Sequence, residues 1–188
     1  KRMTEVFMSR QPLVNRQRRI IATRLTLHLE SGGMPDAVNA LGALASVWQA
    51  RPQGLPYKTA EEALIMASII EKETGRPEDR AHVAAVFVNR LRIGMRLQTD
   101  PTVIYGLGDS FDGNLRKIHL QTDTPYNTYT RAGLPPTPIA MPGLAALQAA
   151  FTPAASKALY FVARGDGSSH FSRTLDEHNQ AVNRYQRG

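Results

Sequence analysis

The sequence contains no cysteine, a single tryptophan and only 7% aromatic residues. The absence of cysteine excludes disulfide bonds, thiolate metal sites and thiol catalysis. No run of about 18 consecutive apolar residues is present, although a membrane-spanning helix requires one. The first residues also lack the apolar segment of a signal peptide. The 188 residues are enough for one sizeable domain, and we expect it to be globular.

Metal and nucleotide sites have no support in the motifs. The histidines lack the i, i+4 spacing that places two metal ligands on one face of a helix. The five histidines are His28, His82, His119, His170 and His178. The stretch 106–108 lacks the remainder of a dinucleotide fingerprint, and Ser68 and Ser110 lack the context of a nucleophile elbow. We therefore expect no metal, no cofactor and no acyl transfer.

The net charge of +7 is unevenly distributed. Residues 1–30 hold seven Lys or Arg and two Glu, a net of +5, and the remainder of the chain contributes +2. A nucleic-acid surface would interleave basic residues with aromatic ones or form a recognisable module, and neither pattern occurs. We therefore expect no nucleic-acid partner.

Hydrophobic periodicity and turn residues predict an α+β fold, a helical core with a small antiparallel sheet. Predicted helices cover residues 36–50, 60–74, 77–93, 100–105, 142–151 and 174–185. Predicted strands cover residues 5–8, 19–23, 158–162 and 169–172, of which the last two form a hairpin. The polar, proline-fixed stretches 124–129 and 134–138 suit an ordered binding loop.

The helix predicted over residues 60–74 carries an acid inside its apolar stripe. At about 100° per residue from Ile69, Glu73 falls at about 40° and Glu71 at about 200°, on the opposite face. Burial and the partial negative charge of the helix C-terminus both disfavour a carboxylate, so both raise the pKa of Glu73. Glu73 is therefore a candidate proton donor. The alternative is an ion pair with Lys72 or a nearby Arg and a purely structural role.

Amides, hydroxyls and aromatic side chains follow this helix, a mixture that suits a sugar polymer. They are Asn89, Gln98, Thr99, Asp100, Tyr105, Tyr126, Asn127 and Tyr129. A hydrolase would need a second carboxylate across the cleft, and Asp100 is the candidate. An Asp before Pro101 is, however, more typical of a helix cap.

Six ordered motifs strongly resemble the YceG-like endolytic murein transglycosylases, the MltG family. They lie at residues 67–74, 86–91, 95–106, 126–129, 133–136 and 159–162, and the resemblance extends over about residues 54–186. It aligns the catalytic acid of the family with Glu73 and implies a YceG-like catalytic domain at residues 51–188. All eight residues of the set named above are then the candidates for holding the glycan.

The resemblance implies cleavage of the β-1,4 bond between N-acetylmuramic acid and N-acetylglucosamine in a peptidoglycan strand. Glu73 would protonate the glycosidic oxygen and then accept the proton of the muramoyl C6 hydroxyl, which closes a 1,6-anhydro ring. The family context further implies action at the periplasmic face of the inner membrane, peptidoglycan synthases as partners, and a membrane anchor in full-length members that this chain lacks.

The first 50 residues depart from the family. They form an atypical basic head, either a fusion or a truncated subdomain, without the LysM-like subdomain or the aromatic Pro-Asp-Thr segment of the family. Residues 6–15 instead resemble the opening strand of EAL/HDOD signalling proteins. Two alternatives to an enzyme follow: a non-catalytic peptidoglycan-binding or regulatory module with an incomplete cleft, and a signalling fragment that binds a cyclic dinucleotide.

Overall fold

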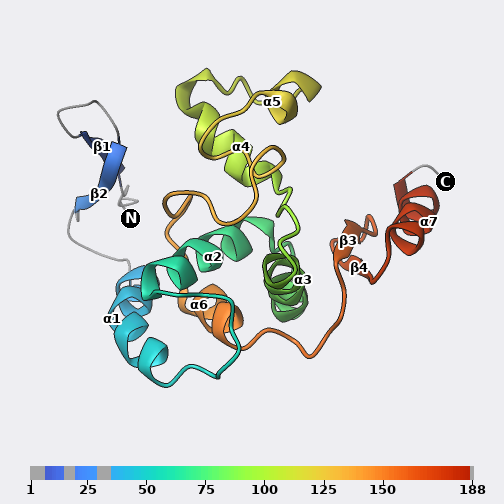
Figure 1. The fold of residues 1–188 in the computed structure, drawn as a ribbon, viewed down its shortest axis with the longest axis horizontal. Helices are drawn as coiled ribbons and strands as arrows, with labels where there is room; N and C mark the ends of the chain where they lie inside the picture. Colours follow the sequence, from blue (N-terminus) through green and yellow to red (C-terminus); the bar gives the residue numbers. More distant parts are fainter. Residues whose placement is uncertain (1–6, 15–19, 29–34, 187–188) are drawn as a thin grey trace, which may run out of the picture.

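The computed structural model describes residues 7–14, 20–28 and 35–186, and it confirms an α+β fold (Figure 1). The helices are α1 (Pro35–Gln49), α2 (Ala60–Glu73), α3 (Arg80–Arg92), α4 (Asp100–Leu107), α5 (Lys117–Gln121), α6 (Leu144–Phe151) and α7 (Leu175–Gln186), with single 3₁₀ turns η1 (Pro77–Asp79) and η2 (Gly108–Ser110). The strands are β1 (Phe7–Val14), β2 (Ile20–His28), β3 (Tyr160–Ala163) and β4 (Ser169–Ser172).

Most predicted elements are present, with shifted ends. The strand predicted at residues 5–8 lies partly outside the described residues, and β1 and β2 are longer than expected. The helix predicted from Pro77 begins as the 3₁₀ turn η1 and becomes α-helical at Arg80. The short helix α5 was not predicted. No described helix has both the length and the apolar character that crossing a membrane requires.

Local signals at both ends fix the extent of α2. The Thr59 hydroxyl accepts a hydrogen bond from the Glu62 amide at 3.2 Å, and the Glu62 carboxylate accepts one from the Lys58 amide at 2.6 Å. At the other end, Thr74 leaves the helical conformation with φ −84° and ψ 110°. Glu73 is therefore the last residue of α2, where the helix meets the loop.

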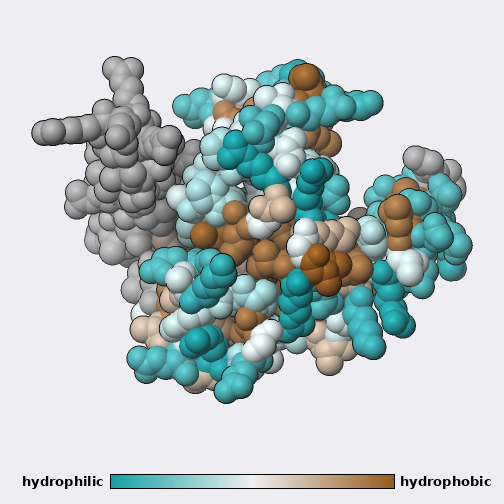
Figure 2. All heavy atoms as spheres, in the orientation of Figure 1, coloured by the Kyte–Doolittle hydropathy of each residue, from teal (hydrophilic) through white to brown (hydrophobic). Residues whose placement is uncertain are grey.

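The core is built around α2, which is buried on nearly all sides. Ala63 and Ala67 of α2 and Ala146 and Ala150 of α6 are all fully buried, and the two helices pack against each other. Small side chains at this interface let the helix axes approach closely. α1 and α3 also pack against α6, so four helices share one apolar core. Figure 2 shows hydrophobic residues gathered across the middle of this face, with hydrophilic residues on the outer elements.

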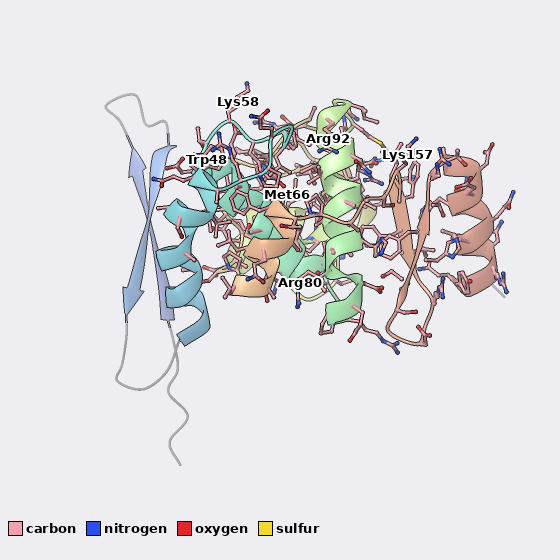
Figure 3. All side chains as sticks on the ribbon, turned by 90° about the horizontal axis from the view of Figure 1, so that it is seen from below. Trp48, Lys58, Met66, Arg80, Arg92 and Lys157 are labelled. Atoms are coloured by element: carbon pink, nitrogen blue, oxygen red, sulfur yellow. The ribbon has the colours of Figure 1, made fainter. Side chains whose placement is uncertain are left out.

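The C-terminal elements form a compact ββα unit beside α3. β3 pairs antiparallel with β4, with Phe161 opposite Phe171, and α7 packs against both strands. Phe161 also meets Phe87 of α3 edge to face, at 5.9 Å between ring centroids. Figure 3 shows α3 standing between the α1 and α6 group and this unit. The second predicted capping box is confirmed, because Thr174 and Glu177 exchange hydrogen bonds at the start of α7.

Candidate active site

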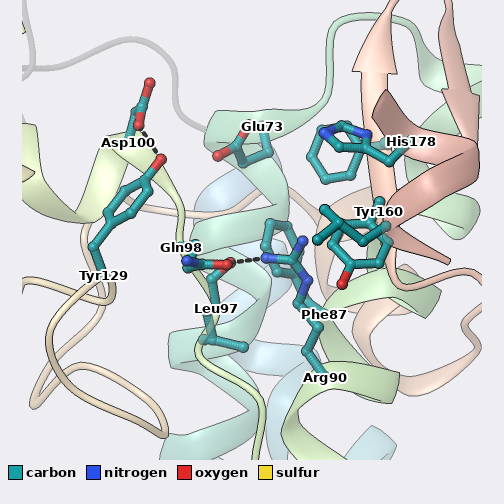
Figure 4. Close-up of a pocket in the computed structure, with 11 residues that line it drawn as sticks. Glu73, Phe87, Arg90, Leu97, Gln98, Asp100, Tyr129, Tyr160 and His178 are labelled. Atoms are coloured by element: carbon teal, nitrogen blue, oxygen red, sulfur yellow. Dashed lines mark hydrogen bonds between the residues drawn. The ribbon is translucent and has the colours of Figure 1, made fainter. Parts of the chain in front are cut away.

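A cavity of about 400 Å³ lies where α2 ends, between the start of α4 and the ββα unit. Its walls come from segments far apart in the sequence (Figure 4). The lining residues are Glu73, Phe87, Arg90, Leu97, Gln98, Asp100, Tyr129, Tyr160, Phe161, Leu175 and His178. Four of the residues selected from the sequence, Glu73, Gln98, Asp100 and Tyr129, therefore meet in one cavity.

Glu73 is half-buried in this cavity, and its Oε1 accepts a hydrogen bond from the Thr99 hydroxyl. Burial is the main cause that raises the pKa of Glu73 above its ordinary value. The Thr99 hydrogen bond opposes this rise, the negative charge of Asp100 adds to it, and the positive charge of Arg90 opposes it. The net direction is upward, which favours a protonated acid.

The structure does not give Glu73 the ion pair that the alternative interpretation requires. Lys72 is exposed, and the ion pairs found among the described residues join Arg116 to Asp112 and Arg131 to Asp123. The carboxyl of Glu73 thus faces the cavity with a hydroxyl, not a cation, as its hydrogen-bond partner.

Glu71 has a different environment, as its place on the helix predicted. Its Oε2 accepts a hydrogen bond at 3.1 Å from the amide of Gly143, the residue that precedes α6. A carboxylate is stabilised at a helix N-terminus, because the first amides of the helix are unpaired and the helix dipole is positive there. Glu71 therefore joins α2 to α6 and lies outside the cavity lining.

A buried network of threonines holds the segment that contacts Glu73. Thr99, Thr102 and Thr128 are each at most 2% exposed. The Thr102 hydroxyl lies 2.8 Å from that of Thr128 and 2.7 Å from the Thr99 carbonyl oxygen, and the Thr99 amide donates to the Thr128 hydroxyl at 3.1 Å. Buried polar networks are rigid when every member is satisfied. The Thr99 hydroxyl is thereby fixed for its bond to Glu73.

Asp100 is not the cap of α4 that its position before Pro101 indicated. Thr99 occupies the N-cap position, and Asp100 is the first helical residue. The Asp100 side chain is exposed and accepts a hydrogen bond from the Tyr129 hydroxyl at 2.5 Å. Burial first, and then the neighbouring Asp100, raise the pKa of Tyr129, so this phenol remains a proton donor. The pair forms one wall of the cavity (Figure 4).

Gln98 has an unusual backbone conformation at the same wall. Its φ is +50°, and no other non-glycine residue in the described ranges has a positive φ. Such conformations cost roughly 1–3 kcal/mol and gather at functional sites. Gln98 is exposed and lines the cavity, while its backbone N–H donates to the Thr128 carbonyl at 3.2 Å.

Two asparagines that were predicted to bind the glycan are engaged with backbone carbonyls outside the cavity lining. The Asn89 amide group donates to the carbonyls of Ser156 and Ala158, at 2.8 and 3.0 Å. Asn127 is fully buried and donates to three carbonyls between residues 119 and 122, at 2.7 to 3.2 Å. Both side chains fix loops that surround the site.

Two predicted aromatic residues also lie outside the cavity lining. The rings of Tyr105 and Tyr126 meet edge to face, at 5.0 Å between centroids. The Tyr126 hydroxyl lies 2.8 Å from that of Thr137. This contact ties residues 126 and 137 of the proline-rich loop together and places the loop against α4.

The wall formed by the ββα unit was missed by sequence reasoning. Tyr160 of β3 and His178 of α7 stack at 5.2 Å between ring centroids, with 24° between their planes. Burial is the first cause that lowers the pKa of His178, and the charge of Arg90 adds to it. His178 follows Leu175 by three residues, so both lie on one face of the predicted helix, and this spacing is a signal that could have indicated the wall.

Among the described residues, no group of three or more His, Asp or Glu side chains could hold a metal ion.

Several known proteins are similar in sequence to this chain. A model of the YceG-like family matches residues 33–184. An endolytic murein transglycosylase of Bacillus subtilis (strain 168) is 46% identical over 127 residues, which cover 68% of this chain and 35% of the relative. The endolytic murein transglycosylase of Streptococcus pneumoniae serotype 2 is 35% identical over 130 residues, which cover 66% of this chain and 23% of the relative. The chain thus spans about a third or less of these relatives.

Solved structures are also similar to this chain. One of them is the 2.6 Å crystal structure of a YceG-like protein from Listeria monocytogenes, with 41% sequence identity and a TM-score of 0.64. The match covers 76% of this chain and 44% of that one.

Proposed function

The chain belongs to the YceG-like family, and we propose that it is the catalytic part of an endolytic murein transglycosylase. Its substrate would be a peptidoglycan strand, cut within the chain at the β-1,4 bond from N-acetylmuramic acid to N-acetylglucosamine. Two relatives that carry the name of this activity support the proposal. The observation that carries it is Glu73, a half-buried carboxyl with a raised pKa that lines a cavity.

Glu73 would first act as the general acid. Its proton passes to the glycosidic oxygen as the bond from that oxygen to the muramoyl C1 breaks, and the N-acetylglucosamine leaves with a free hydroxyl. A raised pKa suits this step, because the acid must hold its proton near neutral pH until the transition state. The N-acetyl group of the muramoyl sugar can stabilise the positive charge that develops at C1, as in substrate-assisted glycosidases.

Glu73 would then act as the general base. The muramoyl C6 hydroxyl attacks C1, the new C–O bond closes the 1,6-anhydro ring, and the hydroxyl proton returns to the Glu73 carboxylate. The acid is regenerated without water. One carboxyl can serve both steps, so Asp100 need not be a nucleophile or a second base.

We propose that the sugar rings lie between the two walls of the cavity. Gln98, Asp100 and Tyr129 on one wall offer hydrogen-bonding groups, and the stacked pair of Tyr160 and His178 on the other offers aromatic surface. The five remaining predicted contacts would then act indirectly, by fixing the loops and the segment that carry these groups. They are Asn89, Thr99, Tyr105, Tyr126 and Asn127.

Action at the periplasmic face of the inner membrane and association with peptidoglycan synthases are proposals for the whole protein. They follow from the membership of this chain in the family and from the cell-wall polymer that its relatives are named for.

Digestion of purified peptidoglycan tests the proposed reaction. The products should end in 1,6-anhydromuramic acid, which mass spectrometry separates from a reducing end by the mass of one water. Reducing ends would indicate a hydrolase and overturn the proposed reaction. Binding to sacculi without any released fragment would instead support the non-catalytic module.

A further inference from the structure

Arg90 is a buried cation that lines the cavity. It lies on α3 and is only 7% exposed. Its Nε donates to the Leu159 carbonyl and its Nη1 to the Leu97 carbonyl, each at 2.7 Å. The guanidinium also lies over the ring of Tyr160, 5.2 Å from the centroid. In Figure 4 it points from α3 into the space between Leu97 and Tyr160. Arg90 therefore joins the two walls.

No carboxylate forms an ion pair with Arg90 among the residues that the structure describes. A buried charge is costly unless it is paired, and burial accordingly lowers the pKa of Arg90. Two carbonyl oxygens compensate part of that cost. The negative charge of an anion in the cavity would compensate more.

Among the groups that line the cavity, Glu73 is the one that can supply this negative charge next to Arg90. Arg90 is the one Lys or Arg among the lining residues, and the two carboxyls there are Glu73 and Asp100. Asp100 is exposed and hydrogen-bonded to Tyr129. Tyr129 and His178 are both favoured in their neutral forms, and Tyr160 presents its ring to the guanidinium. Arg90 and Glu73 line the same cavity, and the positive charge of Arg90 lowers the pKa of Glu73, after the larger effects of burial, Thr99 and Asp100.

We propose that Arg90 is a positioning residue for the proposed reaction: its charge stabilises the Glu73 carboxylate that exists between the two proton transfers. This role rests on the proposed function of Glu73. Arg90 also acts through the backbone, because its bond to the Leu97 carbonyl holds the segment 97–99 that carries Thr99 to Glu73. Burial favours the protonated acid of the first step, while Arg90 and Thr99 favour the carboxylate of the second.

The variants Arg90→Gln and Arg90→Lys separate charge from packing. Glutamine removes the charge, whereas lysine keeps it but cannot reproduce the fixed fork of the guanidinium. Arg92→Gln is the matched control, because Arg92 lies on the same helix, is exposed and donates to the Gly54 carbonyl, away from the cavity. Circular dichroism establishes which variants fold.

Carbon-13 NMR of glutamate-labelled protein, with Glu73→Gln to assign the signal, measures the titration of Glu73 directly. Arg90→Gln should move that titration to higher pH, whereas Arg90→Lys and Arg92→Gln should leave it near the wild-type position. Peptidoglycan digestion should fall at least about tenfold in Arg90→Gln and be restored by lysine to within about tenfold of wild type.

A folded Arg90→Gln variant with an unchanged Glu73 titration would overturn the proposal. If Arg90→Gln does not fold, the test rests on Arg90→Lys. An upward shift of the Glu73 titration in that variant, or a complete loss of digestion by the folded variant, would contradict the role of the charge. The NMR measurement does not depend on turnover. Failure of the wild-type chain to release anhydro ends would therefore reject the proposed function separately from the effect of Arg90 on Glu73.

Discussion

The Thr99 hydroxyl donates a hydrogen bond to the Glu73 carboxyl, joining residues 26 positions apart in the sequence. Thr99 itself is held by Thr102 and Thr128, so its hydroxyl is fixed before any substrate arrives. This contact favours the carboxylate form of Glu73, in opposition to burial, which favours the acid. An acid that must also serve as a base needs both influences.

Thr99→Val removes this hydrogen bond with little change in volume. Hydrogen bonds to charged groups contribute about 1.5–3 kcal/mol, so we expect digestion to slow by about tenfold to a hundredfold. Because the bond lowers the pKa of Glu73, its loss should move the alkaline limb of the pH–rate profile to higher pH. Thr152→Val, at an exposed position after α6, is the control. An unchanged profile in Thr99→Val would show that the contact has no part in catalysis.

Asp100→Asn separates the two roles considered for that carboxylate. The negative charge of Asp100 raises the pKa of Glu73, so its removal should move the alkaline limb to lower pH. At acidic pH we expect a loss of less than about tenfold, the equivalent of about 1.4 kcal/mol. Asp109→Asn, in the exposed turn η2, controls for the loss of one surface charge. Near-complete inactivation at every pH would instead assign Asp100 an essential catalytic role.

The buried acid should also affect stability. A carboxyl whose pKa is raised in the folded state binds more protons there than in the unfolded chain, so the free energy of unfolding falls as pH rises. The fall spans the interval from the ordinary value of 4.5 to the raised folded-state pKa of Glu73. Glu73→Gln lacks this penalty. Urea titrations should therefore show the variant gaining stability relative to wild type as pH rises through that interval, and parallel pH dependences would contradict the raised pKa.

Asn127→Ala tests whether the buried amide supports the loop or contacts the glycan. Its side chain donates to three carbonyls, and leaving buried acceptors unpaired should cost at least about 2 kcal/mol of the free energy of unfolding. Asn179→Ala, at an exposed position of α7, should cost little. Thermal unfolding measures both variants. Normal stability of Asn127→Ala together with a raised KM would place Asn127 in contact with substrate.

Local signals predicted most of the helices and the environment of the key acid. The capping boxes at Thr59 and Thr174 are read within four residues, and both are present in the structure. The helical period alone separated Glu73 from Glu71, and the structure turns one to the cavity and the other to α6. The five-residue α5 was missed because so short a helix has no hydrophobic period to read.

The partners of each side chain could not be predicted in the same way. Asn89 and Asn127 have the hydrogen-bonding groups that a sugar requires, but in the fold they bind the carbonyls of neighbouring loops. Residue type gives a capacity for hydrogen bonding, and only the tertiary structure decides which group uses it. The wall of Tyr160 and His178 likewise depends on how the ββα unit packs against α3, through contacts such as that of Phe161 with Phe87.

Comparison of Glu73→Gln with Glu71→Gln tests the central claim most directly. The two acids lie two residues apart at the end of α2, and the same substitution is made at each. General acid catalysis contributes typically 10²–10⁴-fold, so the rate at which Glu73→Gln releases anhydromuramic ends should fall by about that factor. Glu71→Gln should keep a rate close to wild type, with a lower unfolding temperature because the Gly143 amide loses its charged acceptor. Anhydro ends released at the wild-type rate by a folded Glu73→Gln protein would contradict the account.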